Sequence, residues 1–107
     1  MDAVPQSRID LFAEMESHYE TQDTEYFVKL LDDDDYVVRC RATCILVDLG
    51  GEDKVQHVAK VLKHDSNELV RHEAAFSLVK WDTAVELHHL KMLLQMILAC
   101  LLDMKQQ

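Results

Sequence analysis

The sequence predicts an all-α fold, a short right-handed α-solenoid of helix pairs with five to six helices. Three observations predict it. After Pro5, the single proline, the strong helix breakers are the adjacent Gly50 and Gly51. Apolar residues recur at helical spacing, and no strict alternation of the kind that marks strands persists. A pattern of matching residues also recurs between two 25-residue stretches of the chain, which is typical of a repeat architecture.

The repeat is seen when residues 26–50 are aligned with residues 58–82, an offset of 32 residues. The identities pair Leu30 with Leu62, Asp33 with Asp65, Val38-Arg39 with Val70-Arg71, Ala42 with Ala74, and Leu46-Val47 with Leu78-Val79. Because the matches fall at helical spacing, each copy is interpreted as a helix–turn–helix unit. The repeats are expected at about 24–51 and 52–82.

Each copy has an apolar face on its second helix. In the first copy this face comprises Val38, Ala42, Ile45, Leu46 and Leu49, and in the second it comprises Val70, Ala74, Leu78 and Trp81. Gly50-Gly51 should end the first of these helices, because glycine adopts the left-handed conformation at no steric cost. Ser66 or Asp65 is expected to cap the second.

The flanking segments complete one domain that spans residues 1–107. A helix is expected at about 7–20, with Ser7 as its cap. The pattern Thr83-x-x-Glu86 is a capping box, which predicts the start of a last helix at about 84–104.

Charge is distributed unevenly along the chain, which has a formal net charge of −9. Residues 1–53 hold 14 acidic and 4 basic residues, whereas residues 54–107 hold 6 acidic and 7 basic residues. An acidic chain repels phosphate backbones, so we expect no nucleic-acid partner. The run Asp32–Asp35 lacks the spacing of a calcium loop and precedes a predicted helix, where capping explains it.

The three cysteines and the amino-terminal residues indicate in which cellular compartment the protein is expected. Cys40, Cys44 and Cys100 are odd in number and form no C-x-x-C motif, which indicates reduced thiols and a cytoplasmic protein. The first residues also lack the basic start and apolar stretch of a signal peptide.

The pattern of Asp33, Val38, Arg39, Ala42 and Leu46, repeated from Asp65 to Leu78, resembles HEAT-like repeats of the phycobilisome-lyase type. The resemblance covers about residues 24–82. It implies that the turn aspartate and the following arginine interact between neighbouring repeats, so that Asp33, Arg39, Asp65 and Arg71 form a ladder along the stack. The planar guanidinium suits a carboxylate at a helix amino terminus for physical reasons as well.

The segment LVRHEAAFSL, residues 69–78, is similar to the His-Glu segments of deoxyhypusine hydroxylase, a HEAT-like di-iron enzyme in which several repeats each supply one pair. The resemblance implies His72 and Glu73 as candidate iron ligands. The first repeat instead has Cys40-Arg41 there, and an arginine would repel a cation. Two copies of the chain would be needed to assemble a His₂Glu₂ site.

The last predicted helix is apolar nearly all round, and its candidate interaction surface comprises Leu90, Leu94, Ile97, Leu98 and Leu101. An exposed apolar face of this size marks a partner site, which favours a homodimer through this helix. The alternative is that the N-terminal helix folds back over it. A membrane span is disfavoured, because Lys91, Gln95 and Asp103 interrupt the apolar run.

These patterns predict a protein–protein interaction or scaffold module without catalytic activity or cofactor, with the concave surface and the acidic first half as its binding face. No Ser/His/Asp signature, glycine-rich loop or zinc spacing is found in the sequence. Two alternatives stay open. One is an iron-dependent hydroxylase-like protein that uses His72 and Glu73, and the other is an accessory subunit of a chromophore lyase, as the resemblance implies.

Overall fold

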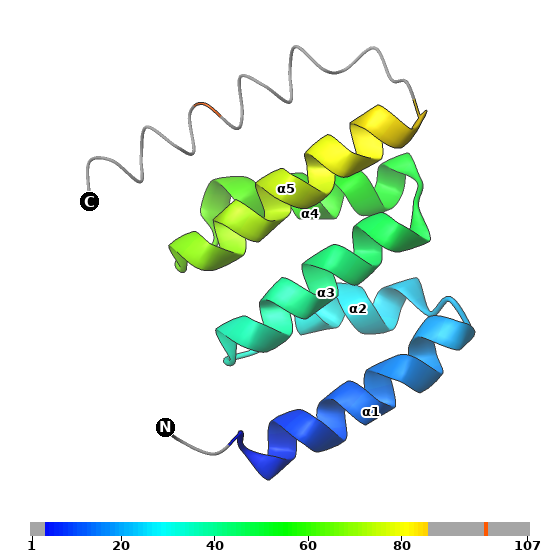
Figure 1. The fold of residues 1–107 in the computed structure, drawn as a ribbon, viewed down its shortest axis with the longest axis vertical. Helices are drawn as coiled ribbons and strands as arrows, with labels where there is room; N and C mark the ends of the chain where they lie inside the picture. Colours follow the sequence, from blue (N-terminus) through cyan, green and yellow to red (C-terminus); the bar gives the residue numbers. More distant parts are fainter. Residues whose placement is uncertain (1–3, 86–97, 99–107) are drawn as a thin grey trace.

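The fold is seen in a computed structural model that describes residues 4–85 and Leu98 (Figure 1). The described residues form five helices and no strand: α1 (Gln6–Glu20), α2 (Thr24–Leu30), α3 (Tyr36–Leu49), α4 (Glu52–His64) and α5 (Glu68–Val85). The prediction of an all-α solenoid is therefore confirmed.

The helices form two layers. The helices α1, α3 and α5 lie side by side in one layer, and α2 and α4 lie in the other (Figure 1). Each α2–α3 and α4–α5 pair packs as a hairpin, and α3 also packs against α5. The repeats are thus stacked through their second helices, with α1 added to the same row ahead of α3.

The core includes the apolar residues that the repeat alignment identified, together with others such as Met15, Phe27 and Val58. Val38, Ala42 and Leu46 in α3 are at most 1% exposed, and so are Val70, Ala74 and Leu78 in α5. Removal of this much apolar surface from water is the main stabilising contribution, about 2 kcal/mol for each large side chain. Ala42 and Ala74 keep the side chains short at mid-helix, where the helices of each repeat pack.

The turns confirm one expected helix end. Gly50 and Gly51, which separate α3 from α4, have φ angles of +81° and +106°. Residues with a side chain rarely adopt such φ angles, so glycine is required at the junction between the two repeats.

The expected helix caps were partly wrong. α1 begins at Gln6 after Pro5, without a side-chain cap, so Ser7 lies inside the helix. Neither Ser66 nor Asp65 caps α5. Its first turn is closed instead by Asn67, whose Oδ1 accepts from the Leu69 N–H at 2.7 Å. Asn67 was missed because Asp and Ser stand just before it and have equal capping preference.

The predicted capping position at Thr83 lies inside α5 instead. The last helix, predicted at about 84–104, lies almost entirely outside the described residues and stays a prediction. α5 continues without a break through Asp82 to Val85. A capping box starts a helix only where the backbone before it is not helical. No glycine or proline interrupts the helix before Thr83, so the backbone stays helical there.

An arginine–aspartate pair joins the two repeats. Arg39 on α3 donates from Nε and Nη2 to the two carboxylate oxygens of Asp65, at 2.9 and 3.3 Å. The two side chains are only 13% and 7% exposed. Arg39 Nη1 also donates to the Asp33 carbonyl at 2.8 Å, and Arg71 Nη1 donates to the Asp65 carbonyl at 2.6 Å. In each repeat the arginine therefore closes its own turn.

A second pair of the same kind attaches α1, and the sequence comparison did not reveal it. Arg8 on α1 donates from Nε and Nη2 to Asp35 at 2.8 and 3.0 Å. The hydrogen bond from Arg8 lowers the pKa of Asp35, although its partial burial acts in the opposite direction. Asp33, by contrast, uses its carboxylate to accept the Asp35 N–H.

We predict that Asp65→Asn lowers the free energy of unfolding by about 3 kcal/mol, because it leaves the Arg39 guanidinium buried without its counter-charge. Urea unfolding followed by circular dichroism would measure the change.

Asp35→Asn provides the matched control, since asparagine preserves the helix cap and the Arg8–Asp35 pair is more exposed. Its loss should be clearly smaller. The contribution of this pair is present at neutral pH and is lost as acid protonates Asp35, whose pKa is lowered in the folded state. Equal losses in the two variants would contradict a dominant role for the Arg39–Asp65 pair.

Candidate functional site

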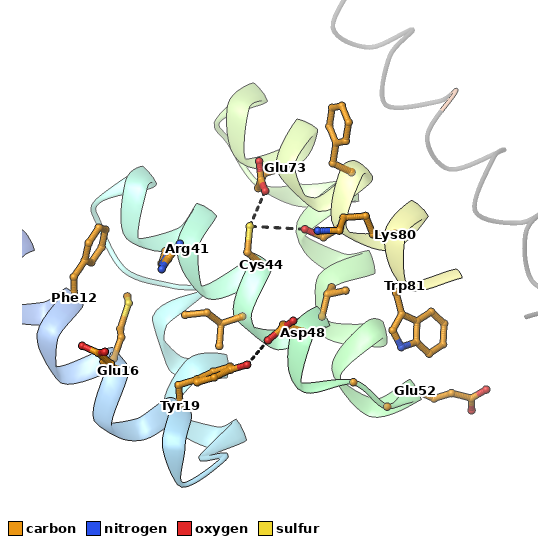
Figure 2. A pocket seen from close by; sticks show the side chains of 17 residues that line it. Phe12, Glu16, Tyr19, Arg41, Cys44, Asp48, Glu52, Glu73, Lys80 and Trp81 are labelled. Carbon is orange, nitrogen blue, oxygen red and sulfur yellow. Dashed lines mark hydrogen bonds between the residues drawn. The ribbon is translucent and has the colours of Figure 1, made fainter. Parts of the chain in front are cut away.

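A groove of about 1320 Å³ runs across the row formed by α1, α3 and α5 (Figure 2). Each of the three helices contributes four residues at spacing i, i+3, i+4 and i+7, which places them on one helix face. These are Phe12, Met15, Glu16 and Tyr19 from α1, Arg41, Cys44, Ile45 and Asp48 from α3, and Glu73, Phe76, Ser77 and Lys80 from α5.

The groove combines an apolar interior with a mainly acidic rim. Val47 and Trp81 add apolar surface, and Gly50, Gly51 and Glu52 form one end. Four carboxylates line it, from Glu16, Asp48, Glu52 and Glu73, against two basic groups, from Arg41 and Lys80. The excess of two acidic groups places negative potential over an apolar surface.

A thiol and a carboxylate meet at the α3–α5 boundary of the groove. Cys44 Sγ donates to Glu73 Oε1 at 2.6 Å, and the Ser77 hydroxyl donates to the same sulfur at 3.9 Å (Figure 2). Burial raises the pKa of the Cys44 thiol to about 11, and the hydrogen bond to Glu73 and its negative charge add to the shift. The thiol is therefore protonated at neutral pH and is not an activated nucleophile.

A hydrogen bond between Tyr19 and Asp48 links α1 to α3 across the groove (Figure 2). The Tyr19 hydroxyl donates to Asp48 Oδ2, and this bond together with the carboxylate charge raises the pKa of the Tyr19 phenol. Since both side chains lie at the surface, they are accessible to a bound molecule.

The predicted metal ligands His72 and Glu73 lie on α5 with different surroundings. His72 is exposed and its ring contacts Phe76, with 5.3 Å between ring centroids, whereas Glu73 faces Cys44 in the groove. Within residues 4–85 no three His, Cys, Asp or Glu side chains are arranged to hold a metal ion. The iron-dependent alternative stays a prediction, which the iron content of the purified protein would test.

The predicted interaction surface lies outside the described residues, except for Leu98, which is 57% exposed. The proposed homodimer through this surface therefore stays a prediction. In the described part of the chain, no helix is both long and apolar enough to cross a membrane.

The groove itself was not predicted residue by residue. The binding face is predicted on the concave surface and in the acidic first half, whereas the groove includes residues of all three helices of one layer. The repeat alignment contained a pattern that could have indicated the groove. Arg41 and Glu73 occupy equivalent repeat positions, as do Cys44 and Phe76, and these positions are displaced around the helix from the apolar face.

The comparisons with known proteins give a family and no individual relative. A model of the HEAT-repeat family, described as "HEAT repeats", matches residues 13–96. No curated protein and no solved structure matches the chain significantly. The match does not separate the phycobilisome-lyase type from other HEAT repeats, so the accessory-lyase alternative stays a prediction.

We predict that Glu73→Gln lowers the pKa of the Cys44 thiol, because it removes the negative charge beside the sulfur. Each unit of decrease raises the thiolate fraction about tenfold near neutral pH. The rate of Cys44 alkylation by iodoacetamide, followed by mass spectrometry of the Cys44 peptide, should rise accordingly.

Glu68→Gln is the matched control for this prediction, because Glu68 lies on the same helix, is exposed and does not line the groove. It should leave the alkylation rate unchanged. If Glu73→Gln also leaves it unchanged, Glu73 does not control the thiol.

Proposed function

Because the chain belongs to the HEAT-repeat family, we propose that it is a protein-binding module whose groove across α1, α3 and α5 holds a segment of a partner protein. The observation that carries the proposal is the common orientation of the three four-residue stripes. Stacked helices present equivalent positions side by side, so one extended surface results from short repeats.

The chemistry of the groove favours a partner segment that carries both apolar and basic side chains. Phe12, Ile45 and Trp81 supply apolar contact, whereas Glu16 and Asp48 supply negative charge at the rim. Basic side chains on the partner would gain from this charge through faster association and correct orientation. An acidic segment would be repelled by the same groups.

The dimensions suit a short helix or an extended peptide. Neighbouring helices pack at roughly 8–10 Å, so a groove across three of them is about 20 Å wide. An α-helix of about four turns has this length. An amphipathic helix that places its apolar side in the groove and its basic residues against the rim is thus a suitable probe.

We predict that a helical peptide of leucine and lysine binds the protein and changes the fluorescence of Trp81, the single tryptophan of the chain. Trp81 lines the groove, so its emission reports occupancy directly. Glu16→Lys should weaken binding by roughly twofold to fivefold, as expected for one exposed charge. A leucine–glutamate peptide of the same length should bind less tightly.

Glu20→Lys supplies the matched control, with the same charge change on the same helix at a residue that does not line the groove. Its titration should match that of the unaltered protein. If Glu16→Lys and Glu20→Lys weaken binding equally, the effect is due to net charge and the groove is not the binding site.

Self-association through the last predicted helix is a separate proposal, and it is supported by the apolar sequence of residues 87–104. We predict that the chain sediments as a dimer and that Ile97→Asp converts it to a monomer, because a charge would be buried in the interface. Sedimentation velocity measures both species. If Ile97→Asp leaves the sedimentation coefficient unchanged, this surface does not form the dimer.

A further inference from the structure

Charged residues of α3 and α5 line the groove in an alternating order. On α3, Arg41 precedes Asp48 by seven residues, and on α5, Glu73 precedes Lys80 by seven residues. Arg41 and Glu73 occupy equivalent positions of the two repeats, and so do Asp48 and Lys80. Both positions therefore carry opposite charges in the two repeats, so the sign of the charge changes along each helix and also from one helix to the next.

The packing of α3 against α5 places these four residues at the corners of a square, called here the charged square. Cys44, one turn after Arg41, donates to Glu73 across the helix boundary, so Arg41 is nearly level with Glu73 and Asp48 is nearly level with Lys80 (Figure 2). Seven residues of helix rise about 10 Å. Neighbouring helices pack at roughly 8–10 Å, so the sides of the square have similar lengths.

The four charges are available to a bound molecule. Arg41, Asp48 and Lys80 are exposed, and Glu73 is half-buried. Within residues 4–85, no ion pair holds either of the two basic groups. The two carboxylates accept hydrogen bonds from neutral donors, a phenol hydroxyl and a thiol, which leave the negative charges in place.

Apolar side chains lie inside the charged square. Ile45 from α3 and Phe76 from α5 line the groove between the corners. Phe76 is 61% exposed, so a bound helix can cover its ring. An aromatic side chain surrounded by polar groups that exclude water is the arrangement in which interface residues contribute most to binding.

We propose that the partner segment is an amphipathic helix whose charges have the complementary alternating order. It crosses α3 with an acidic residue on one flank and a basic residue on the other, and the two signs are exchanged about seven residues later, where it crosses α5. The acidic residues face Arg41 and Lys80, and the basic residues face Asp48 and Glu73. This inference rests on the groove as the binding surface proposed above, and it adds the order of charges that the groove selects.

Net charge alone does not select such a partner. A helix with two acidic and two basic flanking residues has the same net charge in any order, so its long-range attraction to the groove is unchanged. In the alternating order every flanking residue meets an opposite charge. With both acidic residues at one end and both basic residues at the other, two of the four meet a like charge. Like-charge contacts at an interface disfavour the wrong partner.

Two helical peptides of identical composition test the proposal. Both carry the same leucine face. The alternating peptide has the order described above, whereas the segregated peptide has two glutamates on its flanks at one end and two lysines seven residues later. Titration followed by Trp81 fluorescence gives the Kd of each. The alternating peptide should bind roughly tenfold more tightly, because four opposite-charge contacts replace two opposite-charge and two like-charge contacts.

A charge exchange within the protein should reverse this preference. The double variant Asp48→Lys with Lys80→Asp preserves the net charge, but it leaves two basic residues on α3 and two acidic residues on α5. The segregated peptide should then bind more tightly than the alternating one. The exchange Glu20→Lys with Lys60→Glu is the matched control, because both residues are exposed and neither lines the groove. It should keep the preference for the alternating peptide.

The proposal is overturned if the protein binds the two peptides equally, or if the Asp48–Lys80 exchange keeps the preference for the alternating peptide. Equal binding would leave the proposed function in place, since the groove would then accept an amphipathic helix whatever its order of charges. The proposal is also overturned if only the leucine–lysine peptide binds, because net positive charge is then sufficient. If none of the three peptides binds, the groove is not the binding surface and both proposals fail.

Discussion

The buried pair of Arg39 and Asp65 fixes how the two repeats stack, and the rest of the structure depends on this register. Asp65 makes three contacts, two through its carboxylate and one through its carbonyl. Its carboxylate holds Arg39 on the preceding repeat, one of its oxygens accepts the Asn67 N–H at the turn, and its carbonyl accepts from Arg71. One residue therefore ties α3, the turn and α5 together. A hydrophobic interface alone is non-directional, whereas a two-point ion pair permits a single alignment.

The groove is a consequence of that alignment. Its three stripes combine residues that pack between the helices, such as Met15 and Ile45, with charged residues that lie at the surface, such as Glu16 and Asp48. Because α3 and α5 are fixed in register, Cys44 reaches Glu73, and the stripes continue across the helix boundary. The exposed residues of such a surface, such as Glu16, can vary in chemistry at little cost to the fold, so fold and binding preference are separate questions in stacked repeats.

The acidic character of the first half has two structural origins. Some carboxylates support the backbone, as Asp35 does when it accepts the Val37 N–H and binds Arg8. Others face the groove, as Glu16 and Asp48 do. Only the second group creates a potential that a partner could sense. The net charge therefore overstates the negative potential that a partner meets in the groove. The positions of the carboxylates on the helices determine that potential.

The sequence alone determined the helices, the repeat and most of the core. Apolar spacing and the 32-residue offset identify the inner faces of α3 and α5, and Gly50-Gly51 marks the boundary between repeats. These features are encoded within a few residues of one another, because helix periodicity and turn conformation are local properties. Local signals failed at helix ends: Asn67 caps α5, Ser7 lies inside α1, and the capping box at Thr83 lies inside a continuing helix.

The tertiary structure decided which side chains meet across helices. Nothing in the alignment pairs Arg8 with Asp35, because the aligned repeats do not include α1. The two residues are also 27 positions apart in the sequence. The contact between Cys44 and Glu73 likewise joins residues 29 apart on different repeats. Periodicity identifies the face on which a residue lies, but not the residue opposite it. That second property depends on how far one helix is shifted along its neighbour, which is set by the packing of all helices together.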